Sequence, residues 1–370
     1  MTVTVLVPAH NEAATIDRCL GAIEVSSYPV SQIIVVADAC SDDTAARARG
    51  HPGVTVVETD CRDKAGAQNT ALPMATGDIL VGFDADTFPV HDCIARYVEA
   101  IERGGLDGRG LDAVGGTVLP AQQRGFFIRA RQYAYALARR WWRLAQSSVG
   151  RVQVLTGASY AFRTEAIRTV GGFPSVGISA DMDATWTLHR AGYRVEYLGA
   201  AMAYTMDPET WRDYRLQMRR WASGYFQTMR KHRRGILHPA ALLVVGTSLL
   251  DLLTLPVGYL LLVRLVMNNH ERLKVLGLVM VAHTALTTFL VATVIGWRDA
   301  LLGLIPFTLV NSYNKGLYLW CLVREWILGI HYTAWTGRHG RAVTFSRPNP
   351  VRVGGVILIV VAVLAVLLLR

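Results

Sequence analysis

Near residue 236 the chain changes from a sequence that suits water to one that suits lipid. Residues 1–235 carry charges throughout, whereas residues 239–370 consist mainly of long apolar runs with few acids. The second part explains why the whole chain is 52% hydrophobic, with a mean hydropathy of +0.28. We therefore predict a cytosolic globular domain over 1–235 and a membrane domain over 236–370.

Three apolar stretches of the membrane part approach the ~20 residues that a bilayer crossing needs. They cover 240–267, 275–296 and 353–369. A fourth stretch, 301–323, is interrupted by polar residues, and the segment 331–350 after it is rich in arginine. Basic loops prefer the cytosol. We expect three crossings in a multi-pass protein of the cell membrane, with 301–323 along the interface; the alternative is a fourth crossing.

Positive charge gathers on two segments, and the formal net charge of the chain is +10. Basic and aromatic residues alternate over 122–146, and a second basic segment, 208–234, directly precedes the first apolar run. Arginine beside tryptophan and tyrosine suits the bilayer interface. No nucleic-acid-binding motif accompanies these residues. We predict two interfacial amphipathic helices in contact with membrane lipid, and no nucleic-acid partner.

The cysteines indicate a reducing compartment. The chain has five cysteines and no CxxC pair. Such usage is typical of reduced thiols in the cytosol rather than of a disulfide or zinc framework. The chain also enters an apolar strand pattern within its first residues, so we expect no cleaved leader peptide.

Short apolar strands alternate with helical patterns in the N-terminal part. The predicted strands cover 3–7, 32–38, 54–60 and 78–86, and predicted helices cover 12–23 and 42–49. This alternation predicts an α/β fold with a parallel sheet and helices on both faces. Ligands of such sheets bind beyond the carboxyl ends of the strands. We therefore expect the site at that edge.

Charged residues at these strand ends predict a site for a nucleotide and a divalent cation. Asp84 and Asp86 lie two residues apart after an apolar strand. Mg²⁺ or Mn²⁺ is often held by one or two carboxylates together with phosphate oxygens, although such a pair can also be a solvated turn. Asp38 ends another strand and is a candidate contact to a base or ribose, or else a turn residue. Lys64 is a candidate contact to phosphate or base, or else a solvated surface charge.

Seven short motifs follow one another in the order found in the family 2 glycosyltransferases. They are "VPAHNE", "DACSDDT", "DKAGAQN", "DADT", "LTGASYAFR", "ADMDATWTLHRAGYRV" and "QMRRW". The chain resembles this family over residues 3 to about 234. The last motif resembles the Gln-x-x-Arg-Trp signature of the membrane-bound branch, which includes cellulose, hyaluronan, chitin-oligosaccharide and poly-N-acetylglucosamine synthases and ceramide glucosyltransferase. The resemblance implies a Rossmann-like GT-A fold followed by transmembrane helices.

The resemblance also implies which residues bind the donor, a nucleotide-diphosphate sugar whose base is uracil by family habit. These residues are Pro8, Ala9, Asn11, Glu12, Asp38, Lys64, Asp84 and Arg220. Asp84 and Asp86 would hold the cation, Mg²⁺ or Mn²⁺. Arg220 would contact the diphosphate, because a guanidinium donates two parallel hydrogen bonds to phosphate.

By the same resemblance Asp181 is the general base. The family usually has a glutamate directly before this aspartate, and here Ala180 replaces it. The replacement removes one charge beside Asp181. Asp183 is the second choice for the base, and its alternative role is to cap the helix that follows.

Acceptor contacts are implied for Gly157, Ala158, Gln217 and Trp221. On a helix Gln217, Arg220 and Trp221 share one face, and the alternative is an interfacial helix with an aromatic anchor. In the segment 331–350 the stretch "WTGRHGR", with Trp335 and Arg338, resembles the gating loop of hyaluronan- and cellulose-synthase-like enzymes. A basic interfacial loop is the alternative there.

These roles together predict inverting transfer of a sugar to a growing polysaccharide or oligosaccharide at the membrane. The small membrane part favours an alternative, the transfer of one sugar to a lipid acceptor. A polymer channel would require several copies of the chain to assemble, so a homo-oligomer belongs to the first hypothesis. A remote third hypothesis is a non-catalytic membrane scaffold subunit, which the four acids of the motifs disfavour: Asp38, Asp84, Asp86 and Asp181.

Overall fold

The structure is a computed structural model that describes residues 1–104, 108–174, 178–268 and 270–331. Of residues 255–257, 259–268 and 270–273 it describes the backbone only. The predicted crossing 353–369 and the gating-like residues Trp335 and Arg338 lie outside the described residues.

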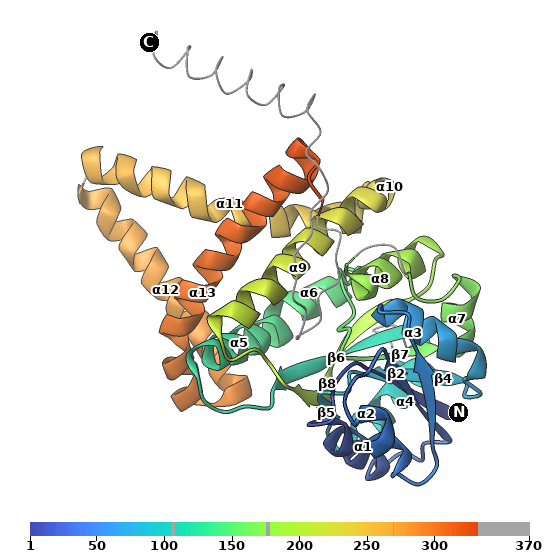
Figure 1. The fold of residues 1–370 in the computed structure, drawn as a ribbon. Helices are drawn as coiled ribbons and strands as arrows, with labels where there is room; N and C mark the ends of the chain where they lie inside the picture. Colours follow the sequence, from blue (N-terminus) through green and yellow to red (C-terminus); the bar gives the residue numbers. More distant parts are fainter. Residues whose placement is uncertain (105–107, 175–177, 269, 332–370) are drawn as a thin grey trace.

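An eight-stranded sheet with the order β3-β2-β1-β4-β7-β6-β8-β5 forms the core of the N-terminal domain (Figure 1). The strands are β1 Val3–Ala9, β2 Gln32–Asp38, β3 Val54–Thr59, β4 Ile79–Phe83, β5 Thr87–Pro89, β6 Ala113–Pro120, β7 Ser159–Arg163 and β8 Val195–Thr205. The four strands predicted from the sequence correspond to β1–β4, which are parallel to one another.

Beyond β4 the sheet is mixed, and the expectation of a parallel sheet is wrong for this half. Strand β7 runs antiparallel to β4 and to β6, β8 runs parallel to β6, and β5 runs antiparallel to β8. Only Asp84–Asp86 separate β4 from β5. A parallel return needs a crossover of a dozen or more residues, so β5 leaves this part of the sheet and joins the far edge.

Helices cover both faces of the sheet because successive strand residues point to opposite sides. Val5 packs with residues of α1 and α4 on one face, and its neighbour Leu6 packs with residues of α3, α7 and α8 on the other. The helices of this domain are α1 Ile16–Glu24, α2 Thr44–Arg49, α3 Lys64–Ala71, α4 Cys93–Arg103, α7 Thr164–Thr169 and α8 Ala180–Arg190, with a 3₁₀ turn at Leu72–Met74.

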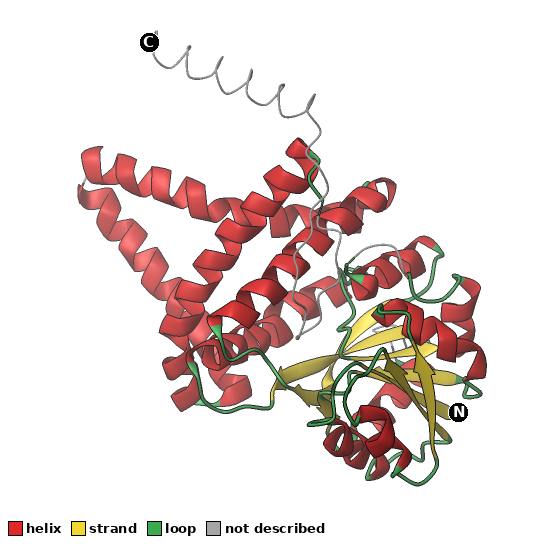
Figure 2. Cartoon of the chain, in the orientation of Figure 1, coloured by secondary structure: helices red, strands yellow, loops and turns green. Residues whose placement is uncertain are grey.

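The remaining helices form a layer beside the sheet, in which α5 and α6 lie nearest to the strands (Figures 1 and 2). The elements of this layer are α5 Phe126–Leu137, a π-helical turn at Ala138–Trp142, α6 Arg143–Ser148, α9 Trp211–Lys231, α10 Arg233–Ile236, α11 Pro239–Asn268, α12 His270–Ile295, α13 Trp297–Leu322 and a second π-helical turn at Val323–Leu328. Buried side chains of α5, α8, α9, α11 and α13 share one apolar cluster. The helix that carries "QMRRW" is therefore packed between the sheet domain and the apolar helices.

Within the described residues, three apolar segments of the C-terminal part are helical. The segments 240–267, 275–296 and 301–323 correspond to α11, α12 and α13. Among the described residues one helical stretch, Lys274–Ile295, is long and apolar enough to cross a bilayer by length and composition, and Pro239–Thr254 is a shorter apolar stretch. The number of crossings stays a prediction.

Candidate active site

The loops at the carboxyl ends of β1, β2 and β3 share an unusual backbone conformation. Asn11, Ala39 and Arg62 have φ angles of 54°, 49° and 52°. Positive φ is costly for residues other than glycine, and such strain gathers at binding sites. The strained positions thus mark the sheet edge at which the sequence predicts the nucleotide.

The β1 and β2 loops are tied together at this edge. After Pro8 and Ala9 end β1, the Asn11 side-chain oxygen accepts a hydrogen bond from the Ser41 amide at 2.8 Å. The Glu12 amide donates to Thr44 Oγ1, also at 2.8 Å. The predicted donor residues of "VPAHNE" therefore lie in a loop whose backbone is fixed by the next strand's loop.

Asp38 uses its carboxylate inside the protein. It is buried and accepts hydrogen bonds from Thr59 Oγ1 at 2.8 Å, the Cys61 amide at 2.7 Å and the Asp63 amide at 3.0 Å. These bonds shape the loop that ends at α3, whose first residue is Lys64. The Asp38 carboxylate therefore holds the backbone of the loop that leads to Lys64, a residue of the predicted donor site.

Lys64 connects three segments that are distant in sequence. Its ammonium group forms an ion pair with Asp84 Oδ1 and donates to the Gly157 carbonyl at 2.9 Å. The Asp84 amide also donates to the Ala158 carbonyl at 3.4 Å. The start of α3, the end of β4 and the loop before β7 therefore meet at one point.

Asp181 lies on the other side of the same loop. A methyl group placed on Gly157 would lie 2.7 Å from Asp181 Oδ2, so a side chain at position 157 would make this carboxylate shift. Burial, followed by the charges of Asp84 and Asp181, raises the pKa of Tyr160 well above its usual range. The Tyr160 phenol therefore stays protonated close to both acids, and it accepts a hydrogen bond from Gln68 Nε2 at 2.6 Å.

Asp86 completes the pair expected to bind a metal ion. Its Oδ1 accepts long hydrogen bonds, both at 3.4 Å, from the hydroxyls of Thr87 and Thr205. No group of three or more His, Cys, Asp or Glu side chains suited to a metal ion occurs in the described part of the chain. Carboxylates are among the ligands that such a cation prefers, and it could take its remaining ligands from a diphosphate.

Asp183 has quite different neighbours from Asp181. Its side chain is buried, with Oδ1 at 2.6 Å from His232 Nε2 and Oδ2 at 2.6 Å from Lys231 Nζ. Both partners come from the end of α9 or directly after it. Asp183 thus joins α8 to α9, and it lies within α8 rather than capping that helix.

Gln217 and Trp221 both contact Arg131 of α5. Arg131 donates to Gln217 Oε1, and its guanidinium lies 4.7 Å from the centre of the Trp221 ring. Arg131 is itself buried, donates to the Tyr135 hydroxyl at 2.5 Å and pairs with Asp207 at 3.6 Å. The sequence alone does not distinguish Arg131 from its neighbouring arginines, because its burial depends on its contacts with α9.

Arg220 lies on the face of α9 that meets the start of α8. One turn later on that face, a methyl group on Gly224 would lie 2.8 Å from Cβ of Ser179, the residue before α8. Because residues four apart share one helix face, this contact places Arg220 on the side of α9 that faces the start of α8. The site combines carboxylates, a lysine and an arginine, which can bind an anionic ligand and accept a proton from a hydroxyl group.

Comparisons with known proteins show which family the chain is similar to. A family model described as "Glycosyltransferase like family 2" matches residues 2–224. The poly-β-1,6-N-acetyl-D-glucosamine synthase of Staphylococcus aureus is 28% identical over 243 residues, which cover 62% of this chain and 58% of that protein. The synthase of the same name from Staphylococcus epidermidis is 26% identical over 226 residues, 60% of this chain and 54% of that protein.

The chain thus spans just over half the length of these curated relatives. A mannosyltransferase from Pyrobaculum calidifontis, solved with GDP-Man and Mn²⁺, is similar in structure, with a TM-score of 0.54 at 23% identity over 87% of this chain and 86% of that one. This likeness shows the fold. The family model covers more than half of the chain, so the protein belongs to the family 2 glycosyltransferases and has their GT-A fold.

Proposed function

We propose that this glycosyltransferase moves a sugar, with inversion, from a nucleotide-diphosphate sugar to a growing polysaccharide or oligosaccharide at the membrane. The observation that carries the proposal is the convergence of Lys64, Asp84 and Asp181 around the loop at Gly157. A uridine nucleotide is the expected donor, by the family resemblance. The curated staphylococcal relatives, named as synthases of a polymer, support the acceptor class.

Asp181 is proposed as the general base. It would take the proton of the acceptor hydroxyl while that oxygen bonds to the anomeric carbon from the face opposite the diphosphate. The carbon–oxygen bond to the diphosphate breaks, and its electron pair leaves with the nucleoside diphosphate. General-base help of this kind contributes ~10²–10⁴ in rate. Gly157 supports the role because it leaves the space that the carboxylate occupies.

The leaving diphosphate needs positive charge. We assign this task to Arg220 and Lys64, and to a divalent cation held by Asp84 and Asp86. When bound, such a cation neutralises charge that develops on the leaving group. The Pyrobaculum mannosyltransferase, which was solved with Mn²⁺, supports a cation at this position. Asp84 would exchange its ion pair with Lys64 for the cation when that ion binds.

The nucleoside is proposed to bind along the strained loops after β1, β2 and β3. Asp38 would shape this pocket by holding the backbone of Cys61 and Asp63. Pro8, Ala9, Asn11 and Glu12 would form its opposite wall. The predicted contact between Asp38 and the base becomes, in this proposal, an indirect one.

The acceptor is proposed to lie over Gly157, Ala158, Gln217 and Trp221. Arg131 would position the last two, because it contacts both from α5. A tryptophan face suits the apolar CH surface of a sugar. We propose that α11 and α12 anchor this site at the cytosolic face of the cell membrane, with residues 1–235 as the catalytic domain.

A screen of donors on the detergent-purified protein tests the proposal. UDP-N-acetylglucosamine, UDP-glucose and GDP-mannose would be supplied separately, and both the released nucleoside diphosphate and the product length would be measured. A ladder of long products from one donor supports a polysaccharide synthase. One sugar on a lipid would establish the second candidate function, and a protein that binds a donor without turning it over would be a scaffold. Asp181→Asn protein gives the background.

A further inference from the structure

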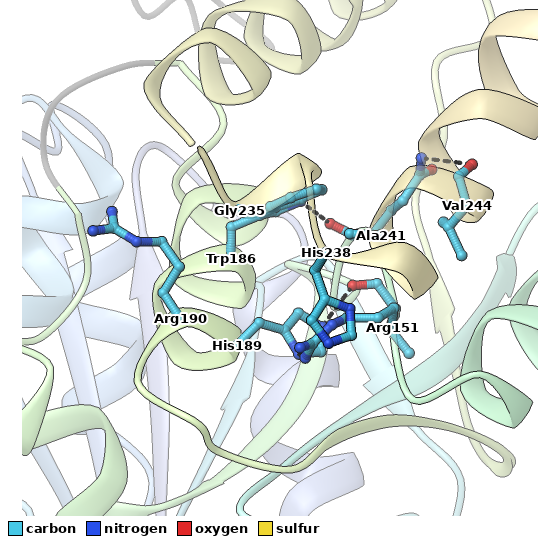
Figure 3. A pocket seen from close by; sticks show the side chains of 10 residues that line it. Arg151, Trp186, His189, Arg190, Gly235, His238, Ala241 and Val244 are labelled. Atoms are coloured by element: carbon cyan, nitrogen blue, oxygen red, sulfur yellow. Dashed lines mark hydrogen bonds between the residues drawn. The ribbon is translucent and has the colours of Figure 1, made fainter. Parts of the chain in front are cut away.

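A cavity outside the catalytic site lies where the end of α8 meets α10 and the start of α11. Its volume is about 240 Å³ (Figure 3). Trp186, His189 and Arg190 contribute to it from the last turns of α8. Asp181 is at the other end of that helix, roughly 12 Å away along its axis at 1.5 Å per residue. The cavity is therefore separate from the proposed base.

One side of the cavity is cationic. Arg151, Arg190 and His238 line it together with His189, and none of the described residues around it is acidic. Figure 3 shows the rings of His189 and His238 beside Arg151. His189 donates from Nε2 to the Val152 carbonyl at 3.0 Å and faces Arg151 Nη1 with Nδ1 at 3.1 Å. A neutral His189 therefore accepts from Arg151 and orients its guanidinium.

The cationic surface continues beyond this cavity. A neighbouring hollow of about 390 Å³ shares Arg190 and Gly235 with it and is also lined by Arg230, Arg233 and Arg234. Such a concentration of arginine, without an acid among the described lining residues, fits a phosphate group.

The other side of the cavity is apolar, which narrows the choice of ligand. Trp186 is buried there, and Ala241 and Val244 come from the first turns of α11. On the surface nearby, Leu237 is 75% exposed and Leu242 is 55% exposed. A free phosphate ion makes no favourable contact with this apolar wall, whereas a phospholipid has both a phosphate group and an apolar acyl chain.

We propose that this cavity binds the phosphate of an anionic phospholipid headgroup, with Arg151, Arg190 and His238 as its donors and the start of α11 beside its acyl chains. The bilayer surface would then lie at the level of α10, directly before the first apolar helix. This assignment is independent of which sugar the enzyme transfers.

Lipid binding would also affect the loop at Gly157, through the residues between Arg151 and Gly157. Between Arg151 and Gly157, Gln153 donates to Ser248 of α11 at 3.1 Å and to the Tyr225 hydroxyl of α9 at 3.2 Å. The Trp186 indole donates to the Gln153 carbonyl at 3.0 Å. Occupancy of the cavity would therefore fix the segment that leads to Gly157.

The test measures lipid retained by the full-length protein in neutral detergent. Phosphatidylglycerol or phosphatidylcholine would be added in known amounts, and bound lipid counted by native mass spectrometry without any donor. We expect phosphatidylglycerol to be retained preferentially. The Arg190→Gln/His238→Gln protein should retain it about tenfold less, because it lacks two of the three proposed phosphate donors. Both side chains are exposed, so the variant should melt at the temperature of the parent protein.

The matched control is Arg96→Gln, which removes one arginine from the exposed side of α4. It should retain phosphatidylglycerol like the parent protein. Equal retention of the two lipids would overturn the proposal, as would a double variant that behaves like the control. Displacement of the lipid by about 10 mM inorganic phosphate would reassign the cavity to the free ion and overturn the lipid assignment.

Discussion

Asp181 and Asp183 stand two residues apart on α8 and meet opposite surroundings. Asp181 lies against the glycine of the catalytic loop, while Asp183 is buried between His232 and Lys231. Removing one partner of a buried charge pair is strongly destabilising. A general base, in contrast, must be reachable by the hydroxyl group that gives up its proton, and Asp181 is only half-buried. Position on the helix, rather than residue type, decides between the two roles.

We therefore expect Asp181→Asn to lower the transfer rate by ~10²–10⁴ while donor affinity and melting temperature stay unchanged. Asp183→Asn should lower the melting temperature and affect the rate far less, because it weakens the link between α8 and α9. Transfer kinetics and thermal unfolding of both proteins check this. The opposite pattern would move the base to Asp183.

His189 makes stability depend on pH. Burial and the charge of Arg151 lower the pKa of His189 to about 4, from an ordinary value near 6.5. A folded-state pKa below the unfolded one means that the stabilisation is present above about pH 6.5 and is lost as the pH falls toward 4. We expect the free energy of unfolding to fall by at most about 3 kcal/mol over this window.

Denaturant unfolding at several pH values measures that slope. His189→Gln should flatten it, because glutamine keeps a donor to the Val152 carbonyl without titrating. His91→Gln, which changes an exposed histidine, should leave the slope as it is. A slope unchanged by His189→Gln would show that another group carries the pH dependence.

At the scale of the elements, we expect the contact between α8 and α9 to determine how far Arg220 lies from Asp181. Gly224 of α9 lies against the residue before α8, since an added methyl would overlap Ser179 Oγ and lie 2.8 Å from Ser179 Cβ. We expect Gly224→Ala to push α9 away and reduce transfer at least tenfold, as a small misplacement of a charged group is costly in catalysis.

Gly246→Ala is the matched control for this change, because nothing lies within 4 Å of that position on α11. Alanine there should be neutral or slightly stabilising. The pair Ser179→Gly/Gly224→Ala should recover part of the lost rate, because it removes the atoms that clash. If Gly224→Ala transfers sugar at the parent rate, the close approach of α8 and α9 has no bearing on Arg220.

The sequence predicts the elements better than their pairing. Strands β1–β4 and helices α11–α13 follow from local apolar patterns, which a single segment carries by itself. The antiparallel half of the sheet depends on which strands pair although they are distant in sequence, and a local sequence pattern does not determine that pairing. The ion pair of Lys64 with Asp84 and the burial of Arg131 between α5 and α9 are missed for the same reason.

At the scale of the whole molecule, the exposed apolar face of α12 raises the question of whether lipid or water surrounds it. Leu278 on α12 is 70% exposed, in a stretch that is long and apolar enough to cross a bilayer. If lipid covers this face, Leu278→Arg should cost up to ~2.5–3.5 kcal/mol of insertion free energy, the upper value being that of an arginine at a helix centre. The amount of protein recovered in the membrane fraction would then fall sharply.

Val25→Arg makes the same kind of change on the sheet domain, where Val25 is 64% exposed. In water an exposed apolar side chain can become charged at little cost, so this protein should fractionate like the parent. Equal recovery of the two variants would mean that α12 is not in contact with lipid.

The ion pair between Lys64 and Asp84 affects how the empty enzyme behaves between turnovers. The Lys64 ammonium is a counter-ion for Asp84. Withdrawal of Mg²⁺ or Mn²⁺ should therefore leave little repulsion between the carboxylates of Asp84 and Asp86. Chelation by EDTA should therefore stop transfer without changing the melting temperature, and re-addition of either ion should restore activity without refolding. A drop in melting temperature with EDTA would contradict this. A site built in this way would not need a bound metal ion to keep its fold.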